Sequence, residues 1–439
     1  MEKATYEEWI QKCIFGQTVN THMTLKDLRE YQIDKVRKAM DYAKNHSPFY
    51  KRLLKDIDPC EIKNFDDFAK VPYTLSDELR NKAQDFLCVP QYMISRIVTL
   101  KTSGTTGKQK RLFFTENDLE KTIDFFHNGM QNLVSSGDNI LVLMPGESYG
   151  SIGDLLKKGL KRFGCEAIIL GPIKDPIKVL EFMKNEKIDC IVGIPVQILK
   201  LAKYKTSNEK YKDIQLNSIL LSADYVPNSI KETVGEAFGC RVFSHYGMTE
   251  MGFGGGVECK YLCGYHMREA DFYFEIIDPI SKKVLPTGHE GEVVFTTLTR
   301  EGMPLIRYRT GDYARFIKEP CKCSDVLPRM DYIRGRISEK IKLQGLTLNI
   351  GLLDEAMFGI KGLVDYKAYI IEKDILQIYA QSLNQNNPVS KFDIKNALYS
   401  SKIAPIFKEE KLSLEYCGEL QNIELSNGML KRKLNNKRN

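Results

Sequence analysis

The sequence lacks several features that mark whole classes of protein. No apolar run reaches the roughly 18 residues that a membrane-spanning helix needs, and no low-complexity block interrupts the 439 residues. The first eight residues, MEKATYEE, are too acidic and polar for a secretory signal peptide. Because 43% of the residues are hydrophobic, the chain can bury more than one core. We expect a globular, cytoplasmic protein with no membrane partner.

The chain also has little excess charge outside its last residues. It contains 64 Lys and Arg against 57 Asp and Glu, a formal net charge of +7. Five of the basic residues fall in the last nine positions, which leaves 59 basic against 57 acidic residues elsewhere. This balance argues against a surface that coats nucleic acid, so no nucleic-acid partner is expected.

The first 60 residues are predicted to be largely helical. Apolar residues recur at helical spacing, namely Leu28, Ile33, Val36, Met40 and Ala43. This helix should end at Ser47, because Pro48 follows and restricts the residue before it.

From about residue 138 the pattern changes to short apolar runs, each closed by glycine, proline or a small polar residue. The runs cover 140–145, 167–171, 190–195 and 219–222, and amphipathic stretches of helix length, such as 177–185 and 229–238, lie between them. Continuous apolar strands that alternate with helices predict a parallel sheet covered on both faces. Ligands of such sheets bind beyond the carboxyl ends of the strands.

Residues 268 to 320 have a different character. Strand signals at 272–277 and 291–296 flank turn residues and predict antiparallel β structure in a small, distorted barrel. New strand and helix signals follow position 336. We therefore expect an α/β fold: a large N-terminal domain (residues 1–336) of parallel sheets flanked by helices, with a small β-barrel-like subdomain, and a small α+β C-terminal domain (residues 337–439).

A loop rich in glycine, serine and threonine follows the apolar run at 96–100. It reads Thr102, Ser103, Gly104, Thr105, Thr106 and Gly107, with Lys110 shortly after. Glycines let the backbone turn tightly toward a polyanion, and the hydroxyls and Lys110 add donors and charge for phosphates. A plain flexible Ser/Thr/Gly loop is the alternative. The segment is not the P-loop of ATPases, because the Gly-Lys-Ser/Thr ending is absent.

Two further motifs suit a nucleotide. In the segment 244–250, Tyr246 can stack on a base, Thr249 can bind phosphate and Glu250 can hold Mg²⁺. In the segment 308–312, the carboxylate of Asp312 stands at a turn and can accept both hydroxyls of a ribose. Each motif alone has a plainer interpretation as a turn, a cap or an exposed acid. Their order and spacing together indicate a nucleotide site.

These motifs resemble the adenylate-forming superfamily, which includes acyl-CoA synthetases, carrier-loading adenylation domains and luciferases. The likeness runs from about residue 28 to 345 and is strongest to the phenylacetate–CoA ligase branch. The markers of this branch are YQI at 31–33, HSPFY at 46–50, VPYT at 71–74, LR at 79–80, EIIDP at 275–279, GEVVFTTL at 291–298 and PLIRYRTGD at 304–312.

The resemblance implies an ATP-dependent ligase for a carboxylic acid. The acid attacks the α-phosphate of ATP, which gives an acyl-adenylate and pyrophosphate, and the thiol of coenzyme A then displaces AMP to give a thioester. ATP, magnesium and coenzyme A are the implied cofactors, and the enzyme is a monomer or homodimer. Two alternatives stay open: a stand-alone adenylation enzyme that loads an acyl carrier protein, and a degenerate nucleotide-binding regulator.

Site roles are carried over from the family residue by residue. The loop Thr102 to Gly107 and Lys110 meet the phosphates, and Thr249 and Glu250 meet the α-phosphate and magnesium. The remaining nucleotide contacts are Ser222, Ala223, Asp224, His245, Tyr246, Gly247, Asp312 and Arg336, the last near the hinge.

The acyl group is expected between the helix near residue 125 and neighbouring strand ends. Its pocket residues are Tyr149, Gly150, Ile194 and His245. An aromatic lining suits a flat aryl acid, although Tyr149 can equally be plain packing, and phenylacetate, a hydroxybenzoate or a small aliphatic acid all stay open. The small C-terminal domain is expected to be mobile and to rotate between the two half-reactions.

The chain departs from the family near its end. The family carries a Gly-Lys-x-x-Arg segment there, and the corresponding run, Gly428 to Arg432, has Met429 in place of the lysine. Lys431 or Lys433 can substitute by a shifted register, adenylation can be slow, or the second half-reaction can dominate. We favour Lys431 and count it as catalytic with Thr249 and Glu250.

Four of the eleven cysteines form two short clusters. Cys259 and Cys263 precede His266, and Cys321 and Cys323 follow after a β segment. Such clusters of soft ligands can form a tetrahedral structural zinc site, and some members of the branch carry a similar set. We expect Cys259, His266, Cys321 and Cys323 as the ligands and Cys263 as a spare. Because no export signal is seen, most other cysteines are expected to be reduced core thiols.

Overall fold

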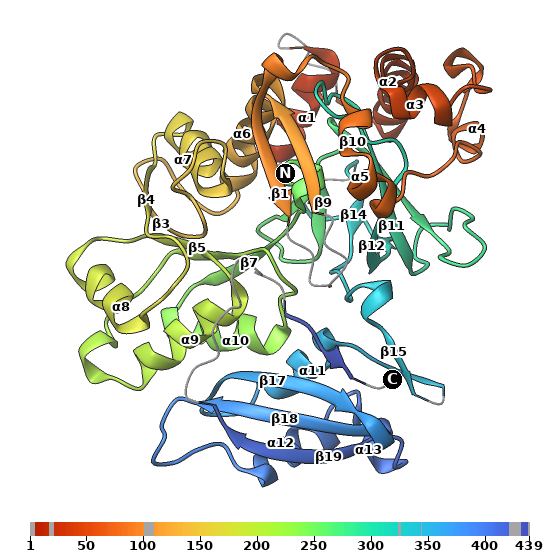
Figure 1. The fold of residues 1–439 in the computed structure, drawn as a ribbon. Coiled ribbons are helices and arrows are strands. Elements are labelled where there is room, and N and C mark those ends of the chain that lie inside the picture. The colour runs from red at the N-terminus through yellow and green to blue at the C-terminus, as the bar shows by residue number, and fades with distance from the viewer. Residues whose placement is uncertain are drawn as a thin grey trace. The chain divides into compact units, whose positions relative to one another are not determined.

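The computed structural model describes residues 5–16, 22–100, 109–323, 326–343, 345–420 and 432–437. The loop Thr102–Gly107, Met429 and Lys431 lie outside these residues. The chain divides into two compact units (Figure 1). Unit 1 comprises Met1–Ser136, Gly146–Cys165 and His245–Ile333, and unit 2 comprises Gly137–Pro145, Glu166–Ser244 and Arg334–Asn439.

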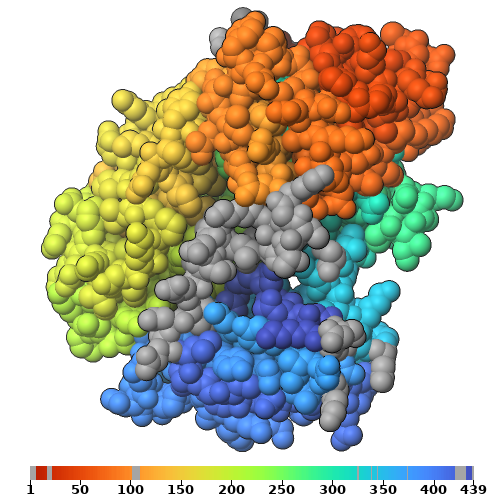
Figure 2. Space-filling view, viewed as in Figure 1, coloured from red at the N-terminus to blue at the C-terminus, as the bar shows by residue number. Residues whose placement is uncertain are grey.

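The N-terminal part of unit 1 is mainly helical, and further helices of the unit follow later in the chain. The helices of the unit are α1 (Thr5–Phe15), α2 (Leu25–His46), α3 (Pro48–Leu53), α4 (Phe65–Phe68), α5 (Ser76–Asn81), α6 (Glu116–Met130) and α7 (Ile152–Arg162). Thr24 and Asp27 form a capping box that starts α2, which ends before Ser47 as predicted. In the space-filling view the red and orange residues of this region form one continuous surface (Figure 2).

The longer strands of unit 1 form one antiparallel sheet and one hairpin. Here β10 (Phe272–Ile277), β11 (Gly291–Thr297) and β12 (Tyr308–Ala314) form a three-stranded sheet. A hairpin joins β1 (Ile94–Leu100) to β2 (Lys110–Thr115). The remaining strands are β8 (Gly256–Glu258), β9 (Tyr265–Met267), β13 (Phe316–Ile317) and β14 (Arg329–Met330). The antiparallel structure predicted for residues 268–320 is therefore confirmed by β10 to β12.

Unit 2 contains the predicted parallel sheet. Its strands are β3 (Asn139–Leu143), β4 (Glu166–Ile169), β5 (Cys190–Gly193), β6 (Ser218–Leu221) and the first four residues of β7 (Arg241–Tyr246), whose last two residues belong to unit 1. All neighbouring pairs are parallel, in the order β7-β6-β5-β3-β4. The helices α8 (Pro176–Asn185), α9 (Pro195–Thr206) and α10 (Asn228–Phe238) connect them. The alternation of apolar strands and helices, and with it the predicted α/β class, is confirmed.

The C-terminal part of unit 2 is an α+β structure. It contains β15 (Ile341–Leu343), β16 (Leu346–Leu348), α11 (Ile350–Met357), β17 (Leu363–Ile371), β18 (Ile375–Ser382), α12 (Lys391–Tyr399), α13 (Ala404–Lys408), β19 (Ser413–Glu419) and β20 (Asn435–Asn436). The sheet order is β19-β18-β17-β20. A single apolar core joins it to the helices of the parallel sheet. At this contact Lys203 of α9 donates to the carbonyls of Ile360 and Leu363, at 3.1 and 2.5 Å.

Within the ranges that the structure describes, no helix combines the length and the apolar character needed to cross a bilayer. The domain boundary between residues 336 and 337 stays a prediction.

Candidate active site and metal cluster

A buried ion pair lies at the centre of the candidate site in unit 1. Lys110 is the first residue of β2, and Glu250 lies in a short 3₁₀ turn, Thr249–Met251. The Lys110 Nζ is 2.5 Å from Glu250 Oε1, and the carboxylate residue is only 3% exposed. The Tyr308 hydroxyl accepts from Lys110 at 2.9 Å and donates to Glu250 Oε1 at 3.2 Å. The predicted phosphate-binding lysine and magnesium ligand are therefore in direct contact, and one tyrosine hydroxyl bonds to both.

Glycines allow the turn that carries Glu250 to fold this tightly. A Cβ atom on Gly247 would lie 2.3 Å from the carbonyl oxygen of Phe253, a separation that real atoms do not reach. Gly252 closes the turn in the left-handed region, with φ of +62°, which glycine adopts without steric cost. Thr249 begins the turn and stands next to Glu250. Gly247 was predicted to contact the nucleotide, and the close approach of the Phe253 backbone by itself also requires glycine at this position.

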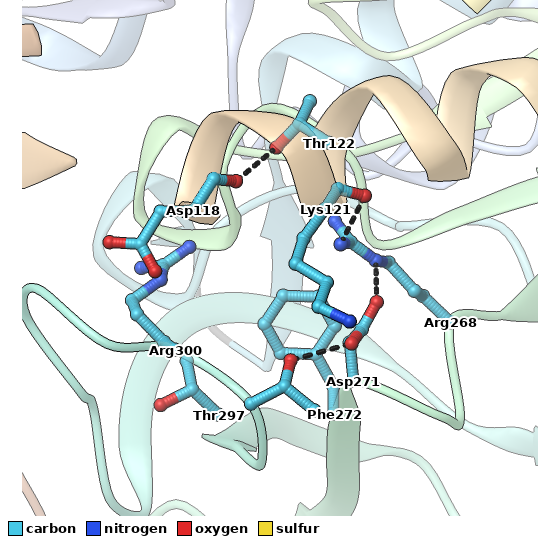
Figure 3. Close-up of a pocket in the computed structure, with 9 residues that line it drawn as sticks. Asp118, Lys121, Thr122, Arg268, Asp271, Phe272, Thr297 and Arg300 are labelled. Carbon is cyan, nitrogen blue, oxygen red and sulfur yellow. Dashed lines mark hydrogen bonds and ion pairs between the residues drawn. The ribbon is translucent and has the colours of Figure 1, made fainter. Parts of the chain in front are cut away.

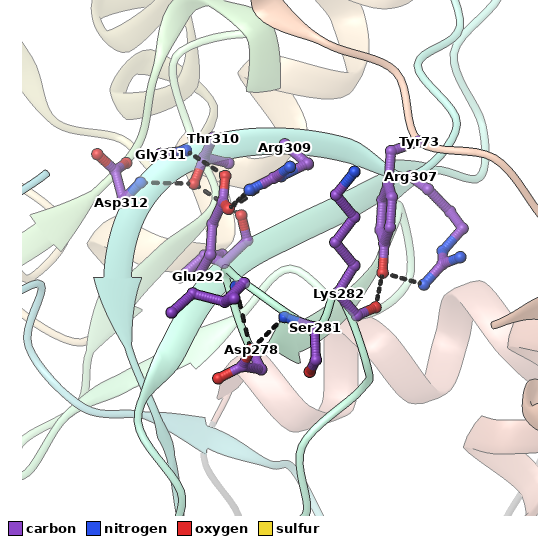
Figure 4. A network of polar contacts seen from close by, with 12 residues as sticks. Tyr73, Asp278, Ser281, Lys282, Glu292, Arg307, Arg309, Thr310, Gly311 and Asp312 are labelled. Carbon is purple, nitrogen blue, oxygen red and sulfur yellow. Dashed lines mark hydrogen bonds and ion pairs between the residues drawn. The ribbon is translucent and has the colours of Figure 1, made fainter. Parts of the chain in front are cut away.

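A polar network on β12 holds the backbone at Asp312, the residue that is predicted to bind the ribose (Figure 4). The backbone N–H of Asp312 donates to Thr310 Oγ1 at 3.0 Å, and that hydroxyl donates to the carbonyl of Val293. Glu292 accepts from the Gly311 N–H at 3.1 Å and from Arg309 Nε at 2.9 Å. The backbone before Asp312 is therefore fixed by side chains.

Tyr246 joins Asp312 to the end of β7. Its hydroxyl donates to Asp312 Oδ2 at 3.0 Å, and both residues are at least nine-tenths buried. The aromatic ring that was predicted to stack on a base and the carboxylate that was predicted to bind a ribose are thus in direct contact. Two motifs that lie 66 residues apart in sequence meet here.

His245 sits among aromatic rings. Its ring centroid is 5.8 Å from that of Phe125 and 6.3 Å from that of Phe126, both on α6. Burial lowers the pKa of His245 to about 4, so the imidazole is neutral at physiological pH. A Cβ atom on Gly254 would lie 2.2 Å from the Phe125 ring, which shows how closely this backbone approaches α6.

The other predicted acyl-pocket residues lie in different surroundings. Tyr149 is 47% exposed; its hydroxyl donates to Glu116, and Lys158 Nζ lies 4.4 Å from its ring centre. Gly150 precedes α7, and its N–H donates to Asp154 at 2.8 Å. Ile194 is buried at the start of α9 in unit 2. Their assembly into one pocket stays a prediction.

In unit 2, the predicted adenine-side segment follows β6. Ser222 is buried, and Ala223 has a positive φ of 77°, an unusual value for a residue with a side chain. Asp224 accepts the N–H of Tyr225 at Oδ1 and the N–H of Arg432 at Oδ2, the latter at 2.8 Å. This carboxylate therefore holds the backbone of the C-terminal segment, a contact that the sequence did not predict.

Arg432 is anchored by side-chain contacts of its own. Its Nε donates to Asp354 Oδ1 at 3.0 Å, and its Nη1 donates to Asp365. The guanidinium also lies 4.8 Å from the ring centre of Phe358 and 4.5 Å from that of Tyr366. Arg432 is the last residue of the run that corresponds to the family's Gly-Lys-x-x-Arg segment, so its anchoring fixes where that run ends. The other predicted hinge-side residue, Arg336, directly precedes the 3₁₀ turn Ile337–Glu339.

The predicted zinc ligands come together in unit 1. One ligand atom from each of Cys259, His266, Cys321 and Cys323 lies within 4.8 Å of the others, and all four residues are buried. The Sγ atoms of Cys259 and Cys321 are 3.6 Å apart, and His266 Nε2 is 3.1 Å from Cys323 Sγ. Zinc with bonds of about 2.0–2.3 Å holds its four ligand atoms roughly 3.3–3.8 Å apart. The donor set and its size therefore fit a tetrahedral zinc ion.

The surroundings of the cluster also suit a metal. A hydrogen bond with Cys323 holds the pKa of Cys259 below its usual range, and zinc binds the thiolate form. The buried Nδ1 atom of His266 has no hydrogen-bond partner among the described residues. Cys263, the predicted spare, lies 3.7 Å from Cys321 Sγ and accepts from Arg329 at 2.8 Å.

Sequence reasoning gave no role to several residues that complete the site. Tyr308 stands four residues before Asp312 on β12, and a period of two places both side chains on the same face of the strand. This spacing was the signal that could have drawn attention to Tyr308. Arg300, which donates to the main-chain carbonyl of Glu250, and Arg432 carried no such signal, because their partners lie far from them in sequence.

Comparisons with known proteins bear on the family and the fold. A family model described as AMP-binding enzyme matches residues 96–298. Phenylacetate-coenzyme A ligase from Thermus thermophilus is 28% identical over 358 residues, with 79% of each chain covered. The Pseudomonas putida enzyme of the same name is 28% identical over 344 residues and 76% of each chain. A solved structure of 2-hydroxyisobutyryl-CoA ligase in the postadenylation state shares the fold, with a TM-score of 0.79, 18% identity, and coverage of 95% of this chain and 90% of that chain.

The fold and the site thus define an α/β enzyme of the AMP-binding type. The matched model and the curated relatives support the adenylate-forming superfamily and, within it, the phenylacetate–CoA ligase branch. Its enzyme class is that of the AMP-forming acid–thiol ligases.

Proposed function

We propose that this ligase joins an aryl carboxylic acid to coenzyme A through an acyl-adenylate, at the expense of ATP and with magnesium. The observation that carries the proposal is the buried contact of Lys110, Glu250 and Tyr308, with Tyr246 and Asp312 joined to each other in the same unit. A lysine, a carboxylate, an aromatic ring and a ribose acceptor are the groups that a magnesium-nucleotide requires.

Phosphate chemistry is assigned to residues at the start of β2 and in the 3₁₀ turn. Lys110, with the loop Thr102–Gly107, would bind the β- and γ-phosphates, and Thr249 would bind the α-phosphate. Glu250 would hold magnesium, since carboxylate oxygens are preferred ligands of that ion. Bound magnesium would offset the negative charge on the phosphates. Catalysis of this kind depends mainly on positioning and charge neutralisation.

The contacts with the nucleoside are carried over from the family. Tyr246 would stack on the adenine, with Gly247 and His245 beside it, and Asp312 would accept the ribose hydroxyls. The segment Ser222, Ala223 and Asp224 would lie along the base. Arg336 would meet the nucleotide near the hinge at residue 336.

An aryl acid is favoured by the aromatic groups around His245. Phe125 and Phe126 contact this neutral imidazole, and flat rings pack favourably against one another. Tyr149, Gly150 and Ile194 would complete the pocket. The 2-hydroxyisobutyryl-CoA ligase named above is named for a small aliphatic acid, so an aliphatic substrate is the rival outcome of the experiment below.

The acyl acceptor is proposed to be the thiol of free coenzyme A. Support comes from the curated relatives, whose names state coenzyme A as their substrate. A carrier protein is the alternative acceptor, and thioester formation with free coenzyme A distinguishes the two. Lys431 would support the adenylation step, and the domain of residues 337–439 would rotate between the two steps.

The cluster Cys259, His266, Cys321 and Cys323 is proposed to hold one structural zinc ion. Four protein ligands leave no open position, which is the pattern of structural rather than catalytic zinc. The cluster would tie the loop after β8 to the segment before β14. A cytoplasmic location is proposed with it, because reduced thiols persist in that compartment.

Pyrophosphate release across a panel of aryl and aliphatic acids, with and without coenzyme A, tests the proposal. We expect turnover with aryl acids, a thioester product only when coenzyme A is present, and loss of both in Glu250→Gln and Asp312→Ala. Each of these substitutions should cost about 3 kcal/mol or more of transition-state stabilisation. Wild-type turnover in either variant would remove the roles assigned to these residues.

A further inference from the structure

The 3₁₀ turn that carries Glu250 is held by two polar side chains that lie outside the predicted nucleotide site. Arg300 Nη1 donates to the main-chain carbonyl of Glu250 at 2.5 Å. Thr122 Oγ1, on α6, donates to the carbonyl of Gly252 at 2.9 Å. The backbone is therefore fixed in the middle of the turn and at the residue after it, while the Glu250 carboxylate faces Lys110.

Arg300 is itself held in place. Its guanidinium carbon lies 5.3 Å from the ring centre of Phe114. The next two residues of its loop, Glu301 and Gly302, donate their N–H groups to the carboxylate of Asp118, at 2.8 and 3.0 Å. Asp118 lies on α6, as does Thr122. The helix thus fixes the Arg300 loop and the Glu250 turn together.

Gly252 shows how tightly these parts fit. A Cβ atom on this residue would lie 2.9 Å from Thr122 Oγ1 and 3.2 Å from Arg300 Nη2. The turn therefore rests directly against both donors. A substitution of Thr122 or Arg300 therefore acts directly on the backbone of the turn.

Arg300 and Thr122 also contribute to the lining of a polar pocket (Figure 3). It is lined by Asp118, Lys121, Thr122, Arg268, Asp271, Phe272, Thr297, Thr299 and Arg300. Asp271 pairs with Arg268 at 2.7 Å and accepts from Thr299 at 2.5 Å. In this pocket Arg268 and Asp271 are thus paired with each other. Arg300 instead donates to the turn that carries Glu250.

We propose that Arg300 and Thr122 are positioning residues that set the orientation of Glu250 for magnesium. The inference rests on the proposed function of Glu250 as the magnesium ligand. Groups that orient a metal ligand from behind commonly change metal affinity or activity by 10–100-fold. Without the two donors the turn can rotate, and the carboxylate then meets the metal in a less favourable orientation.

The magnesium dependence of adenylation tests this inference. Pyrophosphate release, and calorimetric binding of ATP without an acid, would each be measured against magnesium concentration in the full-length protein. The variants are Arg300→Met, Arg300→Lys, Thr122→Val and Thr122→Ser. The Met and Val variants keep the approximate size of the side chain and remove the donor. We expect them to raise the half-saturating magnesium concentration about 10-fold or more. The Lys and Ser variants, which retain a donor, should stay within about 3-fold of wild type, a smaller shift than loss of an orienting donor gives.

A matched control separates positioning from general loss of an arginine. Arg162 on α7 pairs with Glu120 and Asp124 at the surface of the same unit, and Arg162→Met should leave the magnesium dependence unchanged. An unchanged magnesium requirement in both Arg300→Met and Thr122→Val, in a wild-type enzyme that does need magnesium, would overturn the inference. If Arg300→Met does not fold, Thr122→Val decides alone. Absence of magnesium-dependent turnover in wild type would instead overturn the proposed function.

Discussion

The ammonium of Lys110 lies 2.5 Å from Oε1 of Glu250, although 140 residues separate the two in sequence. Both side chains are buried, so each charge depends on the other for its compensation. In the proposed reaction the same carboxylate holds magnesium and the same ammonium meets phosphate. Binding of a magnesium-nucleotide would therefore separate the direct ion pair. Glu250 would then contact magnesium, and Lys110 would contact a phosphate.

Replacement of Lys110 by methionine should weaken both the fold and the reaction. The buried Glu250 carboxylate would lose its partner, and breaking a buried pair in this way costs about 3–5 kcal/mol of the free energy of unfolding. Adenylate formation should fall by about 10²–10³-fold, as for loss of other transition-state donors. Urea denaturation and pyrophosphate release measure the two effects.

The control for this variant is Lys38→Met. Lys38 pairs with Asp34 at 2.7 Å on the exposed face of α2, and exposed pairs contribute only about 0–1 kcal/mol. If Lys110→Met were no less stable than Lys38→Met, the Lys110–Glu250 pair would not be a buried ion pair in solution.

Zinc content tests the cysteine cluster. Protein purified without added metal should contain about one zinc per chain, and the double variant Cys321→Ser, Cys323→Ser should lose the metal together with thermal stability. Structural zinc stabilises the fold directly, because the unfolded chain has no preassembled site. The variant Cys263→Ser should keep the zinc, since this residue is the predicted spare. Elemental analysis that finds no zinc in the wild-type protein would contradict the site.

Burial of His245 should make stability depend on pH. Its pKa is lowered to about 4 in the folded protein, against about 6.5 in an unfolded chain. Because the unfolded state binds the proton more tightly, stability is full above about pH 6.5 and is lost as the pH falls toward 4. Between pH 7 and 5 this residue alone should remove about 2 kcal/mol from the free energy of unfolding.

The variant His245→Phe should lose that part of the pH dependence, measured by urea denaturation at pH 7 and 5. His289→Asn, at an exposed position, should retain it. An identical pH dependence in wild type and His245→Phe would show that the imidazole is not buried in its neutral form.

The family carries a lysine where this chain has Met429, and its absence leads to a prediction about the adenylation half-reaction. If Lys431 substitutes for it, Lys431→Ala should strongly lower adenylate formation but spare thioester formation from a pre-made acyl-adenylate. If no lysine substitutes, Met429→Lys should raise the adenylation rate, since a comparable donor is worth about 10²–10³-fold. Unchanged adenylation in Lys431→Ala, Lys433→Ala and Met429→Lys would show that this segment does not enter the active site.

The sequence allowed prediction of the elements with strong periodic patterns. The strands β3, β5 and β6 are continuous apolar runs because both faces of the sheet are covered, and α2 has a clear apolar stripe and cap. Strands of two or three residues, such as β13, β14 and β20, have no pattern that a sequence can reveal. Their position depends on the tertiary contacts of their neighbours.

The residues of the candidate site also differ in how well the sequence reveals them. Glu250, Asp312 and the cysteine cluster stand in recognisable motifs, because their chemistry requires particular residue types at fixed spacing. Tyr308 and Arg300 act through groups that other loops bring to them. Asp224 stands in a recognisable segment, yet its contact with the Arg432 N–H involves a backbone atom, and no residue type signals such a contact.

Formation of an acyl-CoA thioester is the most direct test of the account. Wild-type protein would be incubated with ATP, magnesium, coenzyme A and a panel of aryl and aliphatic acids, and AMP, pyrophosphate and the thioester would be quantified by mass spectrometry. We predict equal amounts of the three products with at least one aryl acid, and none of them with Glu250→Gln. Binding of ATP without pyrophosphate release for any acid, or adenylate formation with no transfer to coenzyme A, would contradict the assignment as an acid–CoA ligase.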